Sequence, residues 1–231
     1  MKLSLSARVG RIKPSPTLAV TARAQELRRA GRDVIGLGAG EPDFDTPEHI
    51  KEAAIQAIRN GHTKYTAVDG IIELREAISD KFRRDNNIEY AVDQILVSVG
   101  GKHSLYNLFS AVLNAGDEVI IPAPYWVSYP AMALLADAEP VIVSAGPDQG
   151  FKLRPEQVAA AINDATRIFV LNSPSNPTGA AYTRAELEAL AEVLREHPRG
   201  LIVTDDMYEF IYWADETFCR FLTPAPDLYG R

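Results

Sequence analysis

Apolar residues in this chain fall into short continuous runs separated by longer stretches with helical spacing. The runs predict strands, and the stretches between them predict helices. The predicted strands are Val34–Leu37, Ile95–Val99, Glu118–Ile121, Pro140–Val143, Arg167–Leu171 and Leu201–Thr204. The predicted helices are Thr17–Arg29, Pro47–Asn60, Ile71–Asn86, Gly101–Leu113, Tyr125–Leu135, Pro155–Ile162 and Arg184–Leu194. This alternation indicates an α/β fold with a mostly parallel sheet sandwiched by helices.

Proline positions set the expected helix boundaries near the N-terminus. Pro14 and Pro16 exclude a helix through residues 1–16, which we expect to form an N-terminal arm. Thr17 can cap the helix that follows, and Pro47 suits the first position of the next helix.

Composition and charge exclude several classes of protein. The 231 residues are 46% hydrophobic and 24% charged, as in ordinary soluble domains, and no apolar run is long enough to predict a membrane span. The net charge of -7 argues against a nucleic-acid partner. Cys219 is the single cysteine, which excludes an internal disulfide and favours a cytoplasmic location. The four histidines show no metal-ligand spacing, so we expect no metal.

Two glycine-rich segments are candidates for ligand binding. Val97–Ser104 joins a predicted strand to a helix through two glycines, and amides at a helix start favour a phosphate, although close helix–strand packing explains the glycines equally well. A nucleotide P-loop is excluded because His103 stands where Ser or Thr is required. Gly36–Phe44 fails as a dinucleotide fingerprint because Pro42 prevents a helix from opening there. Gly40 could instead let a ligand carboxylate approach the backbone.

Three further segments place polar or aromatic groups after predicted strands. Gly200–Tyr208 ends a buried strand in Asp205, an acid that could pair with a cationic ring nitrogen or simply cap a helix. Asn172–Gly179 holds Asn176 in a frame fixed by two prolines, which favours a ligand contact. Trp126 could stack on an aromatic cofactor, although most lone tryptophans belong to the core.

Taken together, these motifs resemble a known family. The segments occur in the order found in pyridoxal-phosphate aminotransferases of fold type I: Gly40–Phe44, Tyr65, Gly100–Lys102, Tyr125–Trp126, Ser175–Gly179 and Asp205–Tyr208. The chain resembles the class I bacterial aspartate aminotransferases, and among them the group that also accepts prephenate. The resemblance covers nearly the whole chain, and the motifs are specific jointly rather than singly.

The resemblance implies a role for each matched residue. The implied contacts with pyridoxal 5'-phosphate are the ring nitrogen for Asp205, ring stacking for Trp126, the phenolic oxygen for Asn176 and Tyr208, and the phosphate for Gly101, Lys102 and Tyr65. Tyr65 would come from the second subunit of a homodimer. The implied substrate contacts are Lys13, Gly40, Lys102, Trp126 and Asn176, with the two lysines selecting a distal carboxylate.

The resemblance also shows what this chain lacks. The family forms its Schiff base through a lysine in a Ser-Lys-aromatic or Ala-Lys-aromatic context, and none of the lysines here has that context or follows Asp205. We therefore expect the catalytic lysine beyond Arg231 and expect the chain alone to be inactive. Asp206, where a Glu is common, is a minor departure.

The family fold implies an organisation and a reaction. Residues 1–46 would form the arm and part of a small domain, and residues 47–231 an incomplete cofactor-binding large domain. The implied reaction is amino transfer between aspartate or glutamate and a 2-oxo acid such as oxaloacetate or 2-oxoglutarate. A β-lyase, a decarboxylase or a non-catalytic truncated product remain alternatives, because a fold does not fix a chemistry.

Overall fold

The computed structural model describes residues 4–38 and 40–231, so the first three residues of the predicted arm and Ala39 lie outside it. The described residues form two compact units. One comprises the residues up to Ile12 together with Ile72–Arg231, and the other comprises Lys13–Ile71. The predicted domain boundary after residue 46 stays a prediction. Because the two units are not placed relative to each other, each is described by itself.

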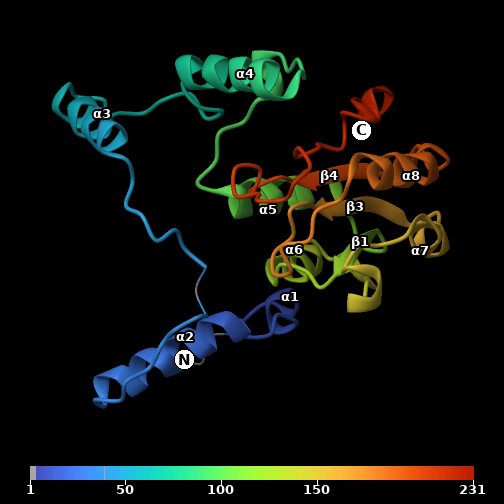
Figure 1. Cartoon of the computed structure of the whole chain (residues 1–231), viewed down its shortest axis with the longest axis horizontal. Coiled ribbons are helices and arrows are strands. Elements are labelled where there is room, and N and C mark those ends of the chain that lie inside the picture. The colour runs from blue at the N-terminus through green and yellow to red at the C-terminus, as the bar shows by residue number, and fades with distance from the viewer. Residues whose placement is uncertain (1–3, 39) are drawn as a thin grey trace. The chain divides into compact units, whose positions relative to one another are not determined.

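The larger unit is built on a sheet of four parallel strands (Figure 1). The strands are β1 (Glu118–Ala123), β2 (Glu139–Ser144), β3 (Thr166–Asn172) and β4 (Leu201–Asp205). Their order is β2-β1-β3-β4, and the register of β3 on β4 sets Asn172 opposite Asp205. The apolar runs form strands because their side chains are buried on both faces of the sheet, as parallel strands require.

Four helices cover the two faces of this sheet (Figure 1). The helices are α5 (Gly101–Val112), α6 (Ser128–Leu135), α7 (Pro155–Ala161) and α8 (Arg184–Arg195). Val119 and Ile121 pack with Phe109 of α5 on one face. Their neighbour Ile120 packs with Leu190 of α8 on the other face, as the two-residue period of a strand dictates. The predicted α/β fold with a helix-covered parallel sheet is confirmed.

The remaining helices lie outside this sandwich. The larger unit also contains α1 (Ala7–Gly10) and α4 (Ile72–Asn86). The other unit contains α2 (Pro16–Arg29) and α3 (Glu48–Arg59). Short 3-10 helices occupy Val92–Gln94, Pro147–Gln149 and Pro226–Leu228.

Two predicted strands are not formed. Val34–Leu37 and Ile95–Val99 have apolar sequences but are irregular in the structure. A strand exists only where a neighbouring strand accepts its backbone hydrogen bonds, and within the described residues neither segment pairs with another strand. The apolar pattern was therefore insufficient to define them.

Several predicted helix boundaries also need correction. Ser15, not Thr17, caps α2, with its Oγ accepting a bond from the Leu18 amide at 3.4 Å. Pro47 occupies the N-cap of α3 instead of its first helical position. Helix α6 begins at Ser128 because residues 124–127 make the turn out of β1. The arm is not free of helix, since α1 forms one turn ahead of Pro14.

Candidate active site

The predicted site residues of the larger unit gather where β1, β3 and β4 end. Trp126 follows β1, Asn176 follows β3, and Asp205 is the last residue of β4. The chain leaves β1 for β2 on one side and returns to β3 on the other, so the strand order reverses between β1 and β3. Open α/β sheets bind their ligands outside the carboxyl ends of strands at such a reversal. The topology alone therefore marks this edge of the sheet as a binding crevice.

The Asp205 carboxylate is held by a buried tyrosine. The Tyr129 hydroxyl of α6 donates to Oδ2 of Asp205 at 2.5 Å, and the Met207 amide donates to Oδ1 at 3.3 Å. Burial, followed by the charge of Asp205, raises the pKa of Tyr129 above its ordinary value, so the phenol keeps its proton and acts as a donor. No helix follows Asp205, so it is not a helix cap, which was the alternative explanation for an acid at this position.

Trp126 and Lys102 meet beside this acid. The Trp126 ring lies edge-on to the Tyr129 ring, with centroids 5.3 Å apart, and the Lys102 ammonium is 5.1 Å from the Trp126 ring centroid. Lys102 is the second residue of α5. The turn before it needs a glycine, because Gly100 has φ 86°. The first hydrogen bonds of this helix come from His103 and Ser104 to the Gly100 carbonyl, which leaves the Gly101 and Lys102 amides as anion donors.

A second pair of polar groups completes the crevice. The Asn176 side-chain amide donates to the Tyr208 hydroxyl at 3.2 Å. Asn172, at the end of β3, ties both segments together. Its amide donates to the Asp205 carbonyl at 2.8 Å, and its Oδ1 accepts from the Asn176 backbone at 2.8 Å. The two strand ends are thus joined by one asparagine.

Sequence reasoning missed two of these residues. The sequence pattern places Tyr129 only within the predicted helix Tyr125–Leu135, and Asn172 only at the start of the segment Asn172–Gly179. A signal existed for Asn172, because a polar residue that closes a buried strand next to a candidate ligand residue suggests a support. Nothing in the sequence pairs Tyr129 with Asp205, which is 76 positions away.

The other predicted site residues belong to the Lys13–Ile71 unit. The side chain of Tyr65 is fully exposed, and a Cβ placed on Gly40 would meet no atom within 4 Å. The structure therefore brings together Gly101, Lys102, Trp126, Asn176, Asp205 and Tyr208. The cofactor and substrate roles of these six residues, like those of Lys13, Gly40 and Tyr65, stay predictions.

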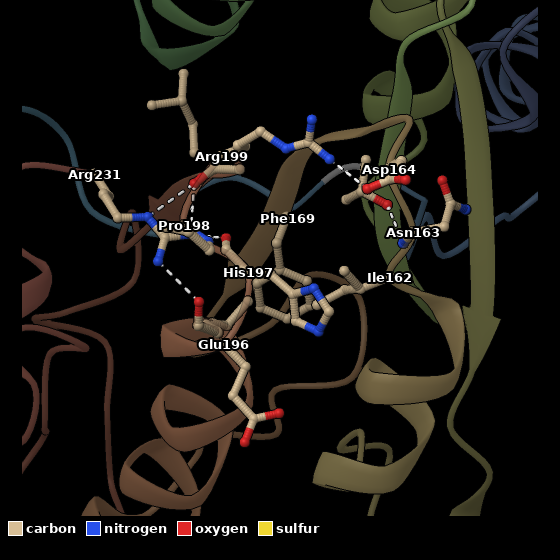
Figure 2. Close-up of a pocket in the computed structure, with 13 residues that line it drawn as sticks. Ile162, Asn163, Asp164, Phe169, Glu196, His197, Pro198, Arg199 and Arg231 are labelled. Carbon is tan, nitrogen blue, oxygen red and sulfur yellow. Dashed lines mark hydrogen bonds and ion pairs between the residues drawn. The ribbon is translucent and has the colours of Figure 1, made fainter.

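A different pocket lies at the opposite end of the sheet, where β3 and β4 begin (Figure 2). There the Arg231 guanidinium donates to the carbonyls of Leu194, His197 and Gly200 at 2.8, 2.6 and 2.7 Å. These bonds satisfy the last carbonyls of α8 and the turn after it, so Arg231 stabilises a helix end. The pocket holds none of the predicted site residues.

Metal-binding clusters and membrane-spanning helices are both absent from residues 4–38 and 40–231. No group of three or more His, Cys, Asp or Glu side chains is arranged to hold a metal ion. No helix in these ranges has the length and apolarity needed to cross a membrane.

Comparison with known proteins identifies the family of the chain. Aspartate/prephenate aminotransferase of Cereibacter sphaeroides is 61% identical over 98% of this chain, and that of Nitrosomonas europaea is 56% identical over 99%. The chain spans 57% and 58% of these relatives' lengths. The aspartate aminotransferase structure from Rhizobium meliloti matches with TM-score 0.95 at 46% identity, over 98% of this chain and 57% of that one. The corresponding Thermus thermophilus structure with maleate matches with TM-score 0.92 at 50% identity, over 97% and 58%.

The family model described as aminotransferase class I and II matches residues 32–229, which include every predicted site residue except Lys13. The chain therefore belongs to the class I and II aminotransferases, a family that depends on pyridoxal 5'-phosphate.

Proposed function

We propose that this chain carries the cofactor-binding part of an aminotransferase. The enzyme would act on an acidic amino acid, aspartate or glutamate, and on a 2-oxo acid, either oxaloacetate or 2-oxoglutarate, with prephenate as a further candidate acceptor. The observation that carries the proposal is the Tyr129–Asp205 pair at the tip of β4, flanked by Trp126. A buried phenol that donates to a carboxylate fixes its direction, which suits a counter-ion for a cationic ring.

The residues at this edge fit pyridoxal 5'-phosphate by the chemistry of their donors. The Gly101 and Lys102 amides offer an anion site for its phosphate, and Trp126 offers a flat face for its ring. Asn176 and Tyr208, already 3.2 Å apart, offer two donors for its phenolic oxygen. Asp205 offers the anion for its ring nitrogen. When bound, the cofactor supplies an electron sink for the Cα–H bond of the amino acid.

A dicarboxylate substrate is supported by two observations. Lys102 places an ammonium beside Trp126 without an ion-pair partner among the described residues, so its charge is available to a substrate carboxylate. The Thermus thermophilus relative is described with maleate, which is a dicarboxylate. We extend this preference to the present chain and assign Lys13 and Gly40 to the same substrate, with Asn176 and Trp126 in contact with it. A homodimer in the cytoplasm, with Tyr65 donated to the neighbouring subunit's phosphate, is part of the proposal.

The lysines of this chain support the view that the Schiff-base lysine lies outside it. In the larger unit, Lys81 pairs with Glu209 and Lys152 with Glu186, while Lys102 lies at the start of α5. None of them follows Asp205 in the sequence. We propose that the 231 residues alone do not transaminate, and that a protein of the relatives' full length does.

The test is an assay of the full-length protein with pyridoxal 5'-phosphate, aspartate and 2-oxoglutarate. We expect oxaloacetate and glutamate to form in equal amounts. Asp205→Asn should reduce the rate by at least about a hundredfold, because the counter-ion to the ring is lost. Asp215→Asn is the matched control, since Asp215 is an exposed acid of the same segment and should leave the rate unchanged.

Other products would contradict the proposal. Release of pyruvate and ammonia from a β-substituted amino acid would identify a β-lyase, and release of CO2 a decarboxylase. No cofactor binding and no turnover in the full-length protein would favour a non-catalytic product.

A further inference from the structure

Two adjacent carboxylates at the end of β4 have different environments. Asp205 receives its bond from Tyr129 of α6, whereas Oδ2 of Asp206 lies 2.5 Å from Nη1 of Arg220. Asp205, the last residue of β4, is therefore bonded by α6, whereas Asp206, which directly follows the strand, is bonded by Arg220 of a later loop. The second acid is not used by the proposed function.

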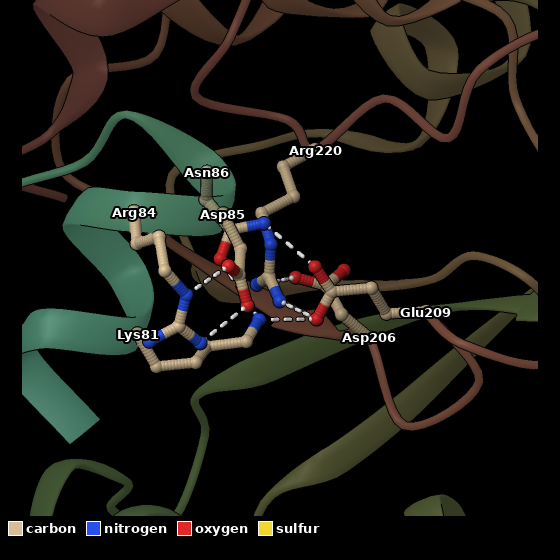
Figure 3. Close-up of polar contacts among 7 residues, drawn as sticks. All are labelled: Lys81, Arg84, Asp85, Asn86, Asp206, Glu209 and Arg220. Atoms are coloured by element: carbon tan, nitrogen blue, oxygen red, sulfur yellow. Dashed lines mark hydrogen bonds and ion pairs between the residues drawn. The ribbon is translucent and has the colours of Figure 1, made fainter. Parts of the chain in front are cut away.

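Asp206 belongs to a cluster of five residues, which we call the clamp (Figure 3). Its members come from α4, from the turn after β4 and from a later loop: Lys81, Asn86, Asp206, Glu209 and Arg220. Figure 3 shows the Arg220 guanidinium between the carboxylates of Asp206 and Glu209. The Arg84–Asp85 pair drawn beside it is a separate contact.

The clamp is nearly buried, and its charges balance. The side chains of Asp206, Glu209 and Arg220 are only 14, 12 and 12% exposed. Glu209 also receives bonds from Lys81 and Asn86, both at 2.6 Å. Among the described residues, Arg220 is the one cation within ion-pair distance of Asp206. Loss of Arg220 would therefore leave Asp206 without a counter-charge while Glu209 kept two partners.

The charge of Asp205, the last residue of β4, affects the pKa of Asp206, which directly follows it. Burial raises the pKa of Asp206 to about 6, and the charge of Asp205 adds to that rise while Arg220 opposes it. The two carboxylates belong to consecutive residues. Without a counter-charge, the buried Asp206 carboxylate would drive the strand tip toward solvent.

The clamp also shapes the turn that carries Tyr208. Asp206 and Glu209 bracket this turn, and the Glu209 amide donates to the Asp206 carbonyl at 3.0 Å. Arg220 holds both ends of the turn with one planar group, which a lysine could not do. Its guanidinium also lies 5.1 Å from the Phe82 ring centroid, which fixes it against α4.

We infer that Arg220 is a positioning residue for the cofactor site, which neutralises Asp206 behind β4 and fixes the Asp206–Glu209 turn. Asp205 and the Tyr208 hydroxyl are thereby presented to the ring, and among the described residues Asp205 is the carboxylate of the pair without an ion-pair partner. This inference rests on the proposed function, because it assigns Arg220 a role toward the cofactor.

The experiment measures pyridoxamine 5'-phosphate binding to the full-length apoprotein by calorimetry. This probe needs no Schiff-base lysine, so its dissociation constant reports on the pocket itself. We expect Arg220→Met, measured at a pH well above the raised pKa of Asp206, to weaken binding by at least about tenfold, because it leaves a buried charge without its partner next to Asp205. Arg220→Lys should fall between Arg220→Met and the wild type. Arg195→Met is the matched control, since it breaks the arginine–carboxylate pair between Arg195, the last residue of α8, and Asp227, and should not change binding.

A double variant separates charge from simple loss of structure. Asp206→Asn in the Arg220→Met background removes the stranded charge, so it should restore most of the lost affinity. The unfolding temperature of each apoprotein shows which variants are folded. Wild-type binding by folded Arg220→Met, or no recovery in a folded double variant, would overturn the inference. Failure of the wild type itself to bind the probe would instead overturn the proposed function, and the inference with it.

Discussion

The two compact units of this chain differ in how they treat apolar side chains. In the α/β unit, Phe109, Ile120 and Leu190 are completely buried. In residues 13–71, no described residue is buried, and Leu37, Phe44 and Val68 are 92, 88 and 96% exposed. Apolar residues recur in both units, so their pattern shows only that a side chain needs cover and does not say which surface provides it.

This difference affects the site directly. The residues that the structure brings together all belong to the unit with a core, where strand ends and helix starts fix each side chain. Lys13, Gly40 and Tyr65 belong to the unit without a core. Exposed apolar patches of this kind mark surfaces that contact other protein. The exposed apolar side chains of residues 13–71 are therefore candidates for such a contact.

The largest expected effect is on the free energy of unfolding, and it comes from replacing a phenylalanine by alanine in each unit. Phe109→Ala removes a fully buried ring between α5 and the sheet, and it should lower the free energy of unfolding by about 3–5 kcal/mol. Phe44→Ala in the 231-residue chain should change it by less than about 0.5 kcal/mol, because no packed atoms are lost. Urea unfolding followed by circular dichroism measures both values. Equal effects would show that residues 13–71 have a core of their own.

The sequence predicted the α/β unit well for a physical reason. Continuous apolar runs such as Val119–Ile121 are buried on both faces wherever they pair, so pattern and structure agree. Val34–Leu37 and Ile95–Val99 have the same pattern but no strand partner among the described residues, and pairing depends on distant segments. The same limit applies to the site. Gly100 and Asp205 could be recognised from local spacing, whereas the Tyr129–Asp205 and Arg220–Asp206 contacts depend on how α6 and a late loop pack around β4.

The next effect compares a buried tyrosine with an exposed one. Tyr129→Phe keeps the ring but removes the donor to Asp205, so it should weaken pyridoxamine 5'-phosphate binding by about tenfold or more, as expected for a hydrogen bond to a charged group. Tyr65→Phe should have no effect in the isolated chain and should weaken binding only in the dimer. Calorimetry on monomeric and dimeric samples tests both. An effect of Tyr65→Phe in a monomer would refute its role across subunits.

Asp206 and Glu209 should change the stability of the α/β unit with pH in opposite directions. Burial raises the pKa of Asp206 to about 6, above the unfolded value of about 4. Its contribution to stability is therefore present below about pH 4 and is lost as the pH rises through about 6. Burial would also raise the pKa of Glu209, but bonds from Lys81, Asn86 and Arg220 lower it below its ordinary value. Its contribution is present at neutral pH and is lost as the pH falls through that lowered value.

Substitution of each acid separates these responses. Asp206→Asn should flatten the fall in stability between about pH 4 and pH 7, because the group that loses its proton there is gone. Glu209→Gln should destabilise the protein at pH 7 and match the wild type in acid. Urea unfolding at a series of pH values measures both slopes. A uniform loss for both variants at every pH would show that the two carboxyls act by packing alone.

The smallest expected effect on stability concerns the N-terminal arm. The arm contacts the α/β unit at residues that are far from it in the sequence. The Arg11 guanidinium donates to the Leu134 carbonyl at 2.9 Å and pairs with Asp137 at the end of α6. Both partners are substantially exposed, so Arg11→Met should cost at most about 1 kcal/mol of unfolding free energy and less at high salt. Arg23→Met breaks the exposed pair with Glu26 in the other unit and is the matched control. Amide hydrogen exchange gives the sharper measurement, because release of the arm should raise exchange at Val9 and Ile12 without altering β1. If exchange were unchanged in Arg11→Met, other contacts would hold the arm on the α/β unit, and the bonds of Arg11 would not be needed for it.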